Sequence, residues 1–374
     1  MRTERVVLGL IIVTLSVSGL IVWNLFAGQP PREEFGFYRA QIQEDREMLR
    51  ELQTSPTTER RIPAAPISTG KAVSAVPASS GNVQYYDPED GQVYQVGYDG
   101  RNQEVLSPTK LPGFVGTIWS PDRQEVISEF VSGGRRIFKY FDYATKRSAT
   151  LNSAIQNVVF SPQGDRIAYF SRTADEAGVV LAQPDGTLPK KILNTRIHQM
   201  ELAWIDQSTI AVVRTDAENS HRELFLLSIE GKFTKLAGPL SGLQARWSRD
   251  GTKALISYFD ESGKLQLAEI LRSSGTIREL AIEALASHCA LTSSSTTAVC
   301  AVSQTPISLA AVEAQTKTPE DFYEIELSSG SKKLLFSSGS RSARAHVADM
   351  FLSPNEQYVF FINSFDEKLY SFRR

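Results

Sequence analysis

The sequence predicts an all-β protein, a β-propeller of four-stranded antiparallel blades, and two observations carry that prediction. A unit of apolar strand, turn and apolar strand recurs about every 43 residues, and a second hairpin motif keeps the same spacing. A single sheet of this size cannot bury both faces, and stacking such sheets radially buries them. We therefore expect a propeller over residues 71–374, with seven blades favoured and six as the alternative.

The first motif is best preserved in residues 161–170, which read Ser-Pro-Gln-Gly-Asp-Arg-Ile-Ala-Tyr-Phe. A degenerate further copy surrounds Pro77. An apolar residue precedes the motif and is expected to fill the gap between neighbouring blades. The anchor positions of six copies lie 41, 44, 43, 45 and 60 residues apart, at Ser120, Ser161, Ile205, Ser248, Ser293 and Ser353, and the apolar residues are Trp119, Phe160, Trp204, Trp247 and Leu352.

The second motif is an alternating strand that runs into a tight turn and then a strand bearing Lys or Arg. Glycine recurs in the turn, as in Asp99-Gly100, Asp185-Gly186 and Glu230-Gly231. Hairpin turns need positive φ, which glycine adopts without a Cβ clash. Two motifs in phase indicate a true structural repeat.

The amino terminus predicts a membrane anchor. Residues 6–26 carry no charge and are long enough to cross a bilayer, whereas a cleaved signal peptide, the alternative, has a shorter apolar region. Arg2 and Arg5 precede this segment, so residues 1–5 are expected to be a cytoplasmic tail. The propeller of this single-pass protein would then be periplasmic or extracellular.

Two further segments separate the expected anchor from the propeller. Residues 33–53 predict a juxtamembrane helix with a short heptad pattern, and weak dimerisation through it is the alternative to a helix lying on the bilayer or the propeller. Residues 54–70 contain Pro56, Pro63 and Pro66 among small polar residues, which is typical of a flexible linker.

Composition and motifs argue against several classes of function. The net charge of −2 and the lack of a basic run exclude a nucleic-acid footprint. The sequence has no Gly-x-Ser-x-Gly elbow, no Asp-x-Asp-x-Asp-Gly calcium loop and no His-Glu-x-x-His segment. We therefore expect no enzyme, no catalytic residue, no metal and no cofactor.

Five residues before inner strands are candidates for a binding site at one mouth of the central channel. Arginine can hold a carboxylate or phosphate in a forked pair of hydrogen bonds, and histidine can tune such a site near neutral pH. The alternative is that these are ordinary polar loop residues. The candidates are Arg196, His198, His288, Arg344 and His346.

Three local features complete the expectations. Cys289 and Cys300 flank one hairpin and can form a cross-strand disulfide outside the cytosol, or remain two buried thiols. The longest repeat contains residues 308–314, which can form a short helix. The last strand, residues 368–372, has no successor, so its edge could accept a partner strand unless the basic residues beside it guard it.

The Ser-Pro-x-Gly-x-x-Ile-Ala-Tyr/Phe pattern at 161–170, echoed at Ser120, Ser248 and Ser353, resembles the propeller repeats of the TolB carboxy-terminal domain and its WD40-like relatives. The resemblance implies a bacterial-type envelope propeller that presents a rigid surface to other proteins. Unlike TolB, which has an amino-terminal α/β domain, this chain is expected to have the membrane anchor, residues 6–26, and the juxtamembrane helix, residues 33–53, before the propeller. We expect a non-enzymatic scaffold that binds envelope proteins, with a small-ligand or glycan site at the channel mouth as the alternative. An undetected hydrolase or lyase is the third possibility.

Overall fold

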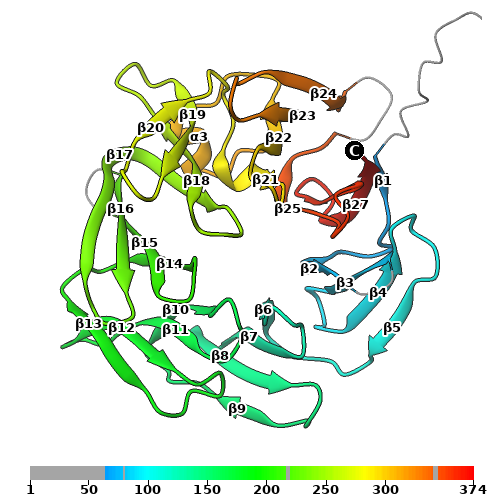
Figure 1. Cartoon of the computed structure of the whole chain (residues 1–374). Helices are drawn as coiled ribbons and strands as arrows, with labels where there is room; N and C mark the ends of the chain where they lie inside the picture. The colour runs from blue at the N-terminus through cyan, green and yellow to red at the C-terminus, as the bar shows by residue number, and fades with distance from the viewer. Residues whose placement is uncertain (1–63, 79–80, 216–219, 340–343) are drawn as a thin grey trace, which may run out of the picture. The chain divides into compact units, whose positions relative to one another are not determined.

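Antiparallel sheets follow one another around a ring in the part of the chain from residue 64 onward (Figure 1). The computed structural model describes residues 64–78, 81–215, 220–339 and 344–374. The expected membrane segment, residues 6–26, and the expected helix, residues 33–53, lie outside the described residues. Within the described residues, no helix is long and apolar enough to cross a membrane.

The described strands form five four-stranded sheets and one seven-stranded sheet, all antiparallel. Each sheet takes consecutive strands of the chain, as the repeat predicts, except that β1 joins the last sheet. The first sheet contains β2 (Val73–Pro77), β3 (Asn82–Tyr86), β4 (Val93–Gly97) and β5 (Glu104–Ser107). The second contains β6 (Phe114–Trp119), β7 (Glu125–Ser132), β8 (Arg135–Asp142) and β9 (Ser148–Thr150). The third contains β10 (Ile155–Phe160), β11 (Ile167–Arg172), β12 (Ala177–Ala182) and β13 (Lys190–Thr195).

The remaining strands complete the ring. The seven-stranded sheet contains β14 (Met200–Trp204), β15 (Thr209–Thr215), β16 (His221–Ser228), β17 (Phe233–Trp247), β18 (Lys253–Phe259), β19 (Leu265–Leu271) and β20 (Ile277–Glu279). The last two sheets are β21 (Cys289–Leu291), β22 (Thr297–Ser303), β23 (Glu320–Glu326) and β24 (Lys332–Phe336), and β25 (Val347–Leu352), β26 (Tyr358–Asn363), β27 (Lys368–Arg373) and β1 (Ala65–Pro66).

The seven-stranded sheet exists because β17 is 15 residues long and pairs with a different neighbour along each half. Its amino-terminal half, Phe233–Ser241, pairs with β16. Its carboxy-terminal half, Ser241–Trp247, pairs with β18. Two groups of strands are therefore joined by one continuous backbone.

The strand β1 closes the ring by pairing with β27. Ala65 lies opposite Ser371, and the backbone N–H of Ile67 donates to the carbonyl of Leu369 at 2.8 Å. The hypothesis that the last strand offers its edge to a partner protein is wrong, because the chain's own β1 occupies that edge. The ordered propeller also begins before residue 71, inside the stretch expected to be a linker.

The repeated serine has a clear structural role. At each of four anchors the buried serine hydroxyl accepts a hydrogen bond from the backbone N–H five residues later, which closes the turn between the first two strands. In the copy of the motif around Ser293, the hydroxyl of Thr292, and not that of the expected anchor Ser293, accepts the hydrogen bond from the backbone N–H of Thr297. The four pairs are Ser120 with Glu125, Ser161 with Arg166, Ser248 with Lys253, and Ser353 with Tyr358.

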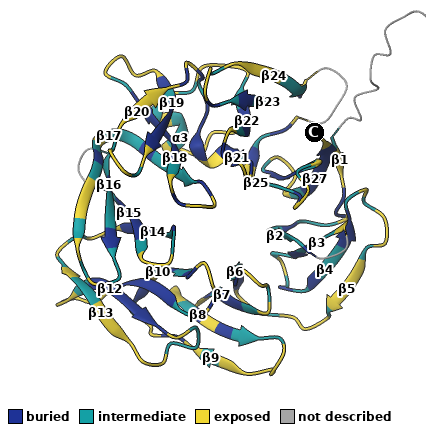
Figure 2. Ribbon diagram, viewed as in Figure 1, coloured by how far each residue is buried: buried dark blue, intermediate teal, exposed yellow. Residues whose placement is uncertain are grey.

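The hydrophobic core lies between neighbouring sheets, and exposed residues are frequent on outer strands such as β5, β9 and β20 (Figure 2). In one cluster Phe170 and Val179 from the third sheet pack with Leu202 and Ile210 from the next sheet, and Trp204 packs against them. Four of the five apolar residues that precede the anchors, Trp119, Phe160, Trp204 and Leu352, pack in clusters that join two sheets, as predicted. Trp247 packs against residues of β15 to β19 within the seven-stranded sheet.

Candidate functional site

Two of the predicted site residues, His288 and His346, lie side by side. His288 ends the short 3-10 helix η2 (Ala286–His288), directly before β21, and His346 directly precedes β25. Their ring centroids are 5.3 Å apart and their planes are nearly perpendicular, at 81°. Both line a cavity of about 370 Å³, called the histidine pocket below. Its other lining residues include Gln244, Leu285, Ser287, Ile307, Val312, Gln315, Thr316, Lys317, Val347 and Ser364.

The other three candidates do not join this pocket. Arg196 and His198 are exposed and follow β13, before β14. Arg344 is exposed, and its described contact is a backbone one, in which its carbonyl accepts a hydrogen bond from Asn363 Nδ2 at 2.9 Å. None of the three lines the histidine pocket. The structure therefore assembles the histidines of the expected rim without the arginines.

A residue that the sequence analysis missed, Glu320, holds the two histidines together. Its side chain is 1% exposed. Nδ1 of His288 lies 2.6 Å from Glu320 Oε1, and Nδ1 of His346 lies 3.5 Å from the same oxygen. The backbone N–H of Val347 donates to Glu320 Oε2 at 2.7 Å. A buried carboxylate is costly unless it is paired, and here both of its oxygens have partners.

One signal in the sequence could have identified Glu320. It is the first residue of β23 and lies on the same face of that strand as the core residue Phe322. A charged residue in the buried register of an alternating strand is unusual and implies a buried partner. The partner could not be named in advance, because it comes from a loop 32 residues earlier.

The hydrogen bonds assign the protons on both imidazoles. A carboxylate and a carbonyl only accept, so Nδ1 of His288 donates to Glu320, and Nδ1 of His346 donates to the carbonyl of Thr318 at 3.0 Å. Burial lowers the pKa of His346, although the nearby Glu320 carboxylate raises it in part. In the neutral state each ring then keeps Nε2 as an acceptor.

The lining of the histidine pocket is of mixed polarity. Lys317 Nζ donates to the carbonyl of Ser364. Ser287 Oγ donates to Gln244 Oε1 at 2.7 Å. Ile307 and Val312 are apolar lining residues and belong to the insertion in the longest repeat.

The insertion contains the helix that the sequence predicts. The helix α3 (Leu309–Glu313) has Ser308 as its N-cap, and the Ser308 side chain accepts a hydrogen bond from the backbone N–H of Ala311. Ile307, Leu309 and Val312 pack on Phe259 and Leu265, so the insertion is attached to the neighbouring sheet. The described residues contain no group of three or more His, Cys, Asp or Glu arranged to hold a metal ion.

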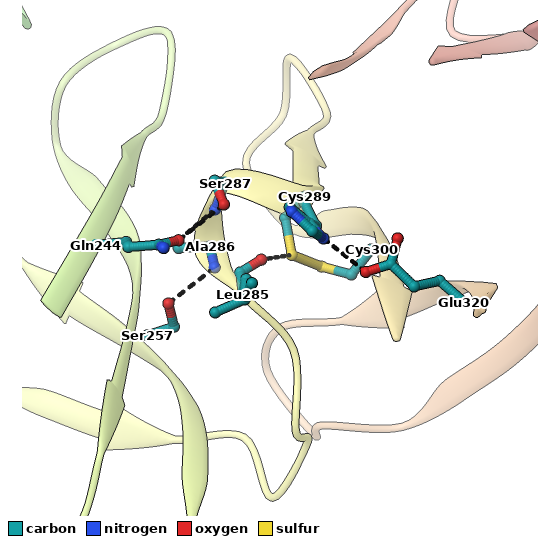
Figure 3. Close-up of a disulfide and its surroundings, with 9 residues drawn as sticks. Gln244, Ser257, Leu285, Ala286, Ser287, Cys289, Cys300 and Glu320 are labelled. Atoms are coloured by element: carbon teal, nitrogen blue, oxygen red, sulfur yellow. Dashed lines mark hydrogen bonds and ion pairs between the residues drawn. A yellow bond between two sulfur atoms is a disulfide. The ribbon is translucent and has the colours of Figure 1, made fainter. Parts of the chain in front are cut away.

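A disulfide joins the two strands that follow His288 in the chain (Figure 3). Cys289 and Cys300 are bonded, and they are opposite partners on β21 and β22 with Cα atoms 4.0 Å apart. Cys289 follows His288 in the chain, so the bond fixes the backbone that carries this histidine. Figure 3 also shows Ser287 turned toward Gln244 on the neighbouring sheet.

A second cavity, of about 360 Å³, lies between the sheets β2–β5 and β6–β9. Its lining is mostly apolar or aromatic, with Val93, Leu111, Pro112, Phe130 and Phe141 among the residues. Exposed apolar residues adjoin two of the lining residues in the chain. Leu106 precedes the lining residue Ser107, Val131 follows Phe130, and both side chains are more than 40% exposed. The sequence analysis did not identify this surface.

Comparison with known proteins supports the fold. No protein-family model matches the sequence, and no curated protein matches it either. A solved oligogalacturonate lyase from Vibrio parahaemolyticus is similar, with a TM-score of 0.62 and 11% identity over 83% of this chain and 93% of that chain. The β-propeller domain of the Trilobed protease from Pyrococcus furiosus has a TM-score of 0.55 and 10% identity over 81% and 93%.

TolB from Acinetobacter baumannii is also among the similar structures. Its TM-score is 0.47 and its identity is 13%, over 68% of this chain and 63% of that chain. This chain thus spans less than two thirds of the length of that TolB.

One prediction must be corrected. The sequence analysis concluded that the chain is not an enzyme because no catalytic motif is present. That conclusion is wrong, because the lack of a known motif does not exclude catalysis: an oligogalacturonate lyase has a similar fold at only 11% identity. A propeller of this kind does not exclude catalysis. At the level of fold, the chain is an all-β protein similar to solved β-propellers, such as the Cps50 (Swd1) β-propeller domain.

Proposed function

We propose that this chain is a propeller of the cell envelope that recognises a protein partner through an apolar surface on the sheets β2–β5 and β6–β9. The observation that carries the proposal is the grouping of exposed apolar side chains. Among the described residues, eight large hydrophobic side chains are exposed, and four of them fall within residues 105–131. These four, called the apolar surface below, are Val105, Leu106, Val115 and Val131.

Exposed apolar side chains on two sheets that enclose a preformed cavity are a feature of a protein contact site. Scattered surface apolar residues are common in soluble proteins, but a group rimmed by polar residues marks an interaction site. The cavity between the two sheets could receive an anchoring side chain of the partner, as hot-spot residues do. Lys139 lies over the ring of Phe130 at 5.1 Å and supplies a positive charge at the rim.

The edge strand β5 adds a second mode of contact. It pairs with β4 and is the outermost strand of its sheet (Figure 1). Glu104, Val105 and Leu106 on this strand are exposed. An extended segment of a partner could hydrogen bond along β5 and place apolar side chains on the neighbouring surface.

The architecture that we propose has seven blades. The seven-stranded sheet would count as two four-stranded blades that share β17, because each half of β17 pairs on one side only. The pairing of β1 with β27 would complete the seventh blade.

We also propose that residues 6–26 anchor the chain in a membrane, with residues 1–5 in the cytoplasm and the propeller on the opposite side. The uncharged length of this segment supports the proposal. Residues 33–53 would form the juxtamembrane helix, with weak dimerisation as a possible role. Removing residues 1–26 should then release the protein from membranes after alkaline extraction, whereas continued sedimentation with the membranes would contradict the anchor.

A site-specific crosslinking experiment tests the recognition proposal. A benzophenone amino acid at position 115 should form one defined crosslinked species in intact membranes, while the same group at the exposed position 188 should not. The substitutions Leu106→Lys and Val131→Lys should each reduce this species at least about tenfold, because a contact worth about 1.4 kcal/mol changes affinity tenfold. Leu188→Lys is the matched control. Equal crosslinking in all variants would overturn the proposal.

A further inference from the structure

The charges around the histidine pocket are arranged asymmetrically. Among the described residues that line it, Lys317 is the charged side chain, and none of them is Asp or Glu. The carboxylate of Glu320 is 1% exposed, and its two oxygens accept hydrogen bonds from His288 and from the backbone of Val347. A ligand in the pocket would therefore meet an ammonium group and two imidazoles before it met a negative charge.

Lys317 retains the capacity to bind a ligand. Its ammonium group has three N–H donors, and the structure assigns one of them to the carbonyl of Ser364. The positive charge also reaches the neighbouring ring, because Lys317 contributes to lowering the pKa of His346. Lys317 and His346 both line the histidine pocket.

Apolar residues in the lining select for an apolar part of the ligand. Ile307 and Val312 line the pocket and are held there by packing on Phe259 and Leu265. These two residues come from the insertion that makes one repeat about 17 residues longer than its siblings. A ligand with charge alone would leave them uncovered.

We infer that the histidine pocket binds a small organic carboxylate, with its charged end at Lys317, joined by His346 once that ring is protonated, and a short branched apolar tail against Ile307 and Val312. A volume of about 370 Å³ accommodates a molecule of this kind. A free organic acid and the carboxyl end of a peptide share this chemistry. The inference is independent of the protein-binding proposal, since the apolar surface lies on different sheets.

Binding should strengthen on mild acidification. His346 faces Glu320, His288, Lys317 and the carbonyl of Thr318, and burial keeps its pKa below the usual value of 6.5. The ring is therefore neutral at pH 7.5. Protonating it at lower pH adds a positive charge beside the bound carboxylate, which remains ionised above about pH 5.

Calorimetric titration of the full-length chain tests the inference, with 4-methylpentanoate as the probe. We expect saturable binding that is tighter at pH 5.5 than at pH 7.5. The alcohol with the same tail, 4-methylpentan-1-ol, and inorganic phosphate should each bind at least tenfold more weakly. The dipeptide acetyl-Ala-Leu separates the two sources, because it should bind more tightly than the free acid if the natural ligand is a peptide end and more weakly if it is not.

Two substitutions locate the site. Lys317→Met should weaken the binding of 4-methylpentanoate at least tenfold, and His346→Asn should remove the gain in affinity at pH 5.5. Lys333→Met, at an exposed position on β24, is the control. It should change neither the affinity for 4-methylpentanoate nor its dependence on pH. Absence of saturable binding, equal binding of acid and alcohol, or an unchanged affinity in folded Lys317→Met would each overturn the inference. If His346→Asn does not fold, Lys317→Met and the ligand series still decide it.

Discussion

His288 donates from Nδ1 to Oε1 of Glu320 across 2.6 Å, and this contact joins the start of β21 to the start of β23. Glu320 also accepts from the backbone of Val347 in the next sheet. One buried carboxylate therefore contacts both histidines and links two neighbouring sheets. The contact sets both the shape of the histidine pocket and part of the stability of the ring.

Replacing Glu320 with Gln should destabilise the fold. The substitution keeps the size of the side chain but removes the charge that both imidazoles face, and one amide N–H would meet a donor. We expect a loss of about 1–3 kcal/mol in the free energy of unfolding, measured by urea denaturation. Glu261→Gln, at an exposed position, is the control and should change stability by less than about 0.5 kcal/mol.

Acidification should destabilise the protein in part through His346. Its pKa is lowered in the folded state, so the unfolded chain binds the proton at higher pH than the folded chain does. The stability contributed by the neutral ring is present above pH 6.5 and is lost as the pH falls through the folded-state pKa. Without added ligand, wild-type protein should lose more stability between pH 7.5 and 5.5 than His346→Asn does.

The control for the pH series is His198→Asn, because His198 is exposed. Its pH profile should follow that of the wild type. A His346→Asn variant that loses as much stability as the wild type over the same pH range would contradict the prediction.

Breaking the Cys289–Cys300 disulfide should cost stability. The bond closes a short loop, with a sequence separation of 11 residues, and such cross-links stabilise by about 2–3 kcal/mol. The double variant Cys289→Ser, Cys300→Ser should show this loss in urea denaturation, and reductant should not affect it further. Intact mass after alkylation, with and without reductant, checks the bond in the wild type, and free thiols before reduction would contradict it.

Ile67→Ala tests the closure of the ring. Ile67 is 4% exposed and packs with Leu369 and Val96. Removing its buried side-chain atoms should cost about 2–4 kcal/mol of unfolding free energy. Leu188→Ala, at a side chain that is 75% exposed, should be nearly neutral. Equal effects of the two substitutions would show that residues near β1 do not support the ring.

The fold was predictable because its determinants are local and repeated. The turn closed by Ser161 and Arg166 is visible in the sequence, and the other anchors follow the same geometry. The helix α3 was predictable for the same reason, since Ser308 and the apolar residues after it are contiguous. Patterns within one repeat are sufficient for these features.

The rest depends on contacts between distant residues. β1 contains two residues in a proline-rich stretch, and its partner strand ends about 300 positions later. His288 and His346 occupy equivalent positions before inner strands, which is why they lie close together. The contact of both with Glu320 could not be predicted, because it depends on how β23 pairs with its neighbours. Arg196 and Arg344 have equivalent positions too, and their side chains do not line the pocket. Equivalent sequence positions therefore predict the region of a residue and not its contacts.

The pairing of β1 with β27 has a consequence for biosynthesis. Ala65 is translated about 300 residues before Ser371, which lies opposite it. The sheets can form one after another as they emerge, but the sheet that contains β1 stays incomplete until β27 has been made. A ribosome that stalls late would release a chain with an unprotected β1, and quality-control proteases could recognise that segment.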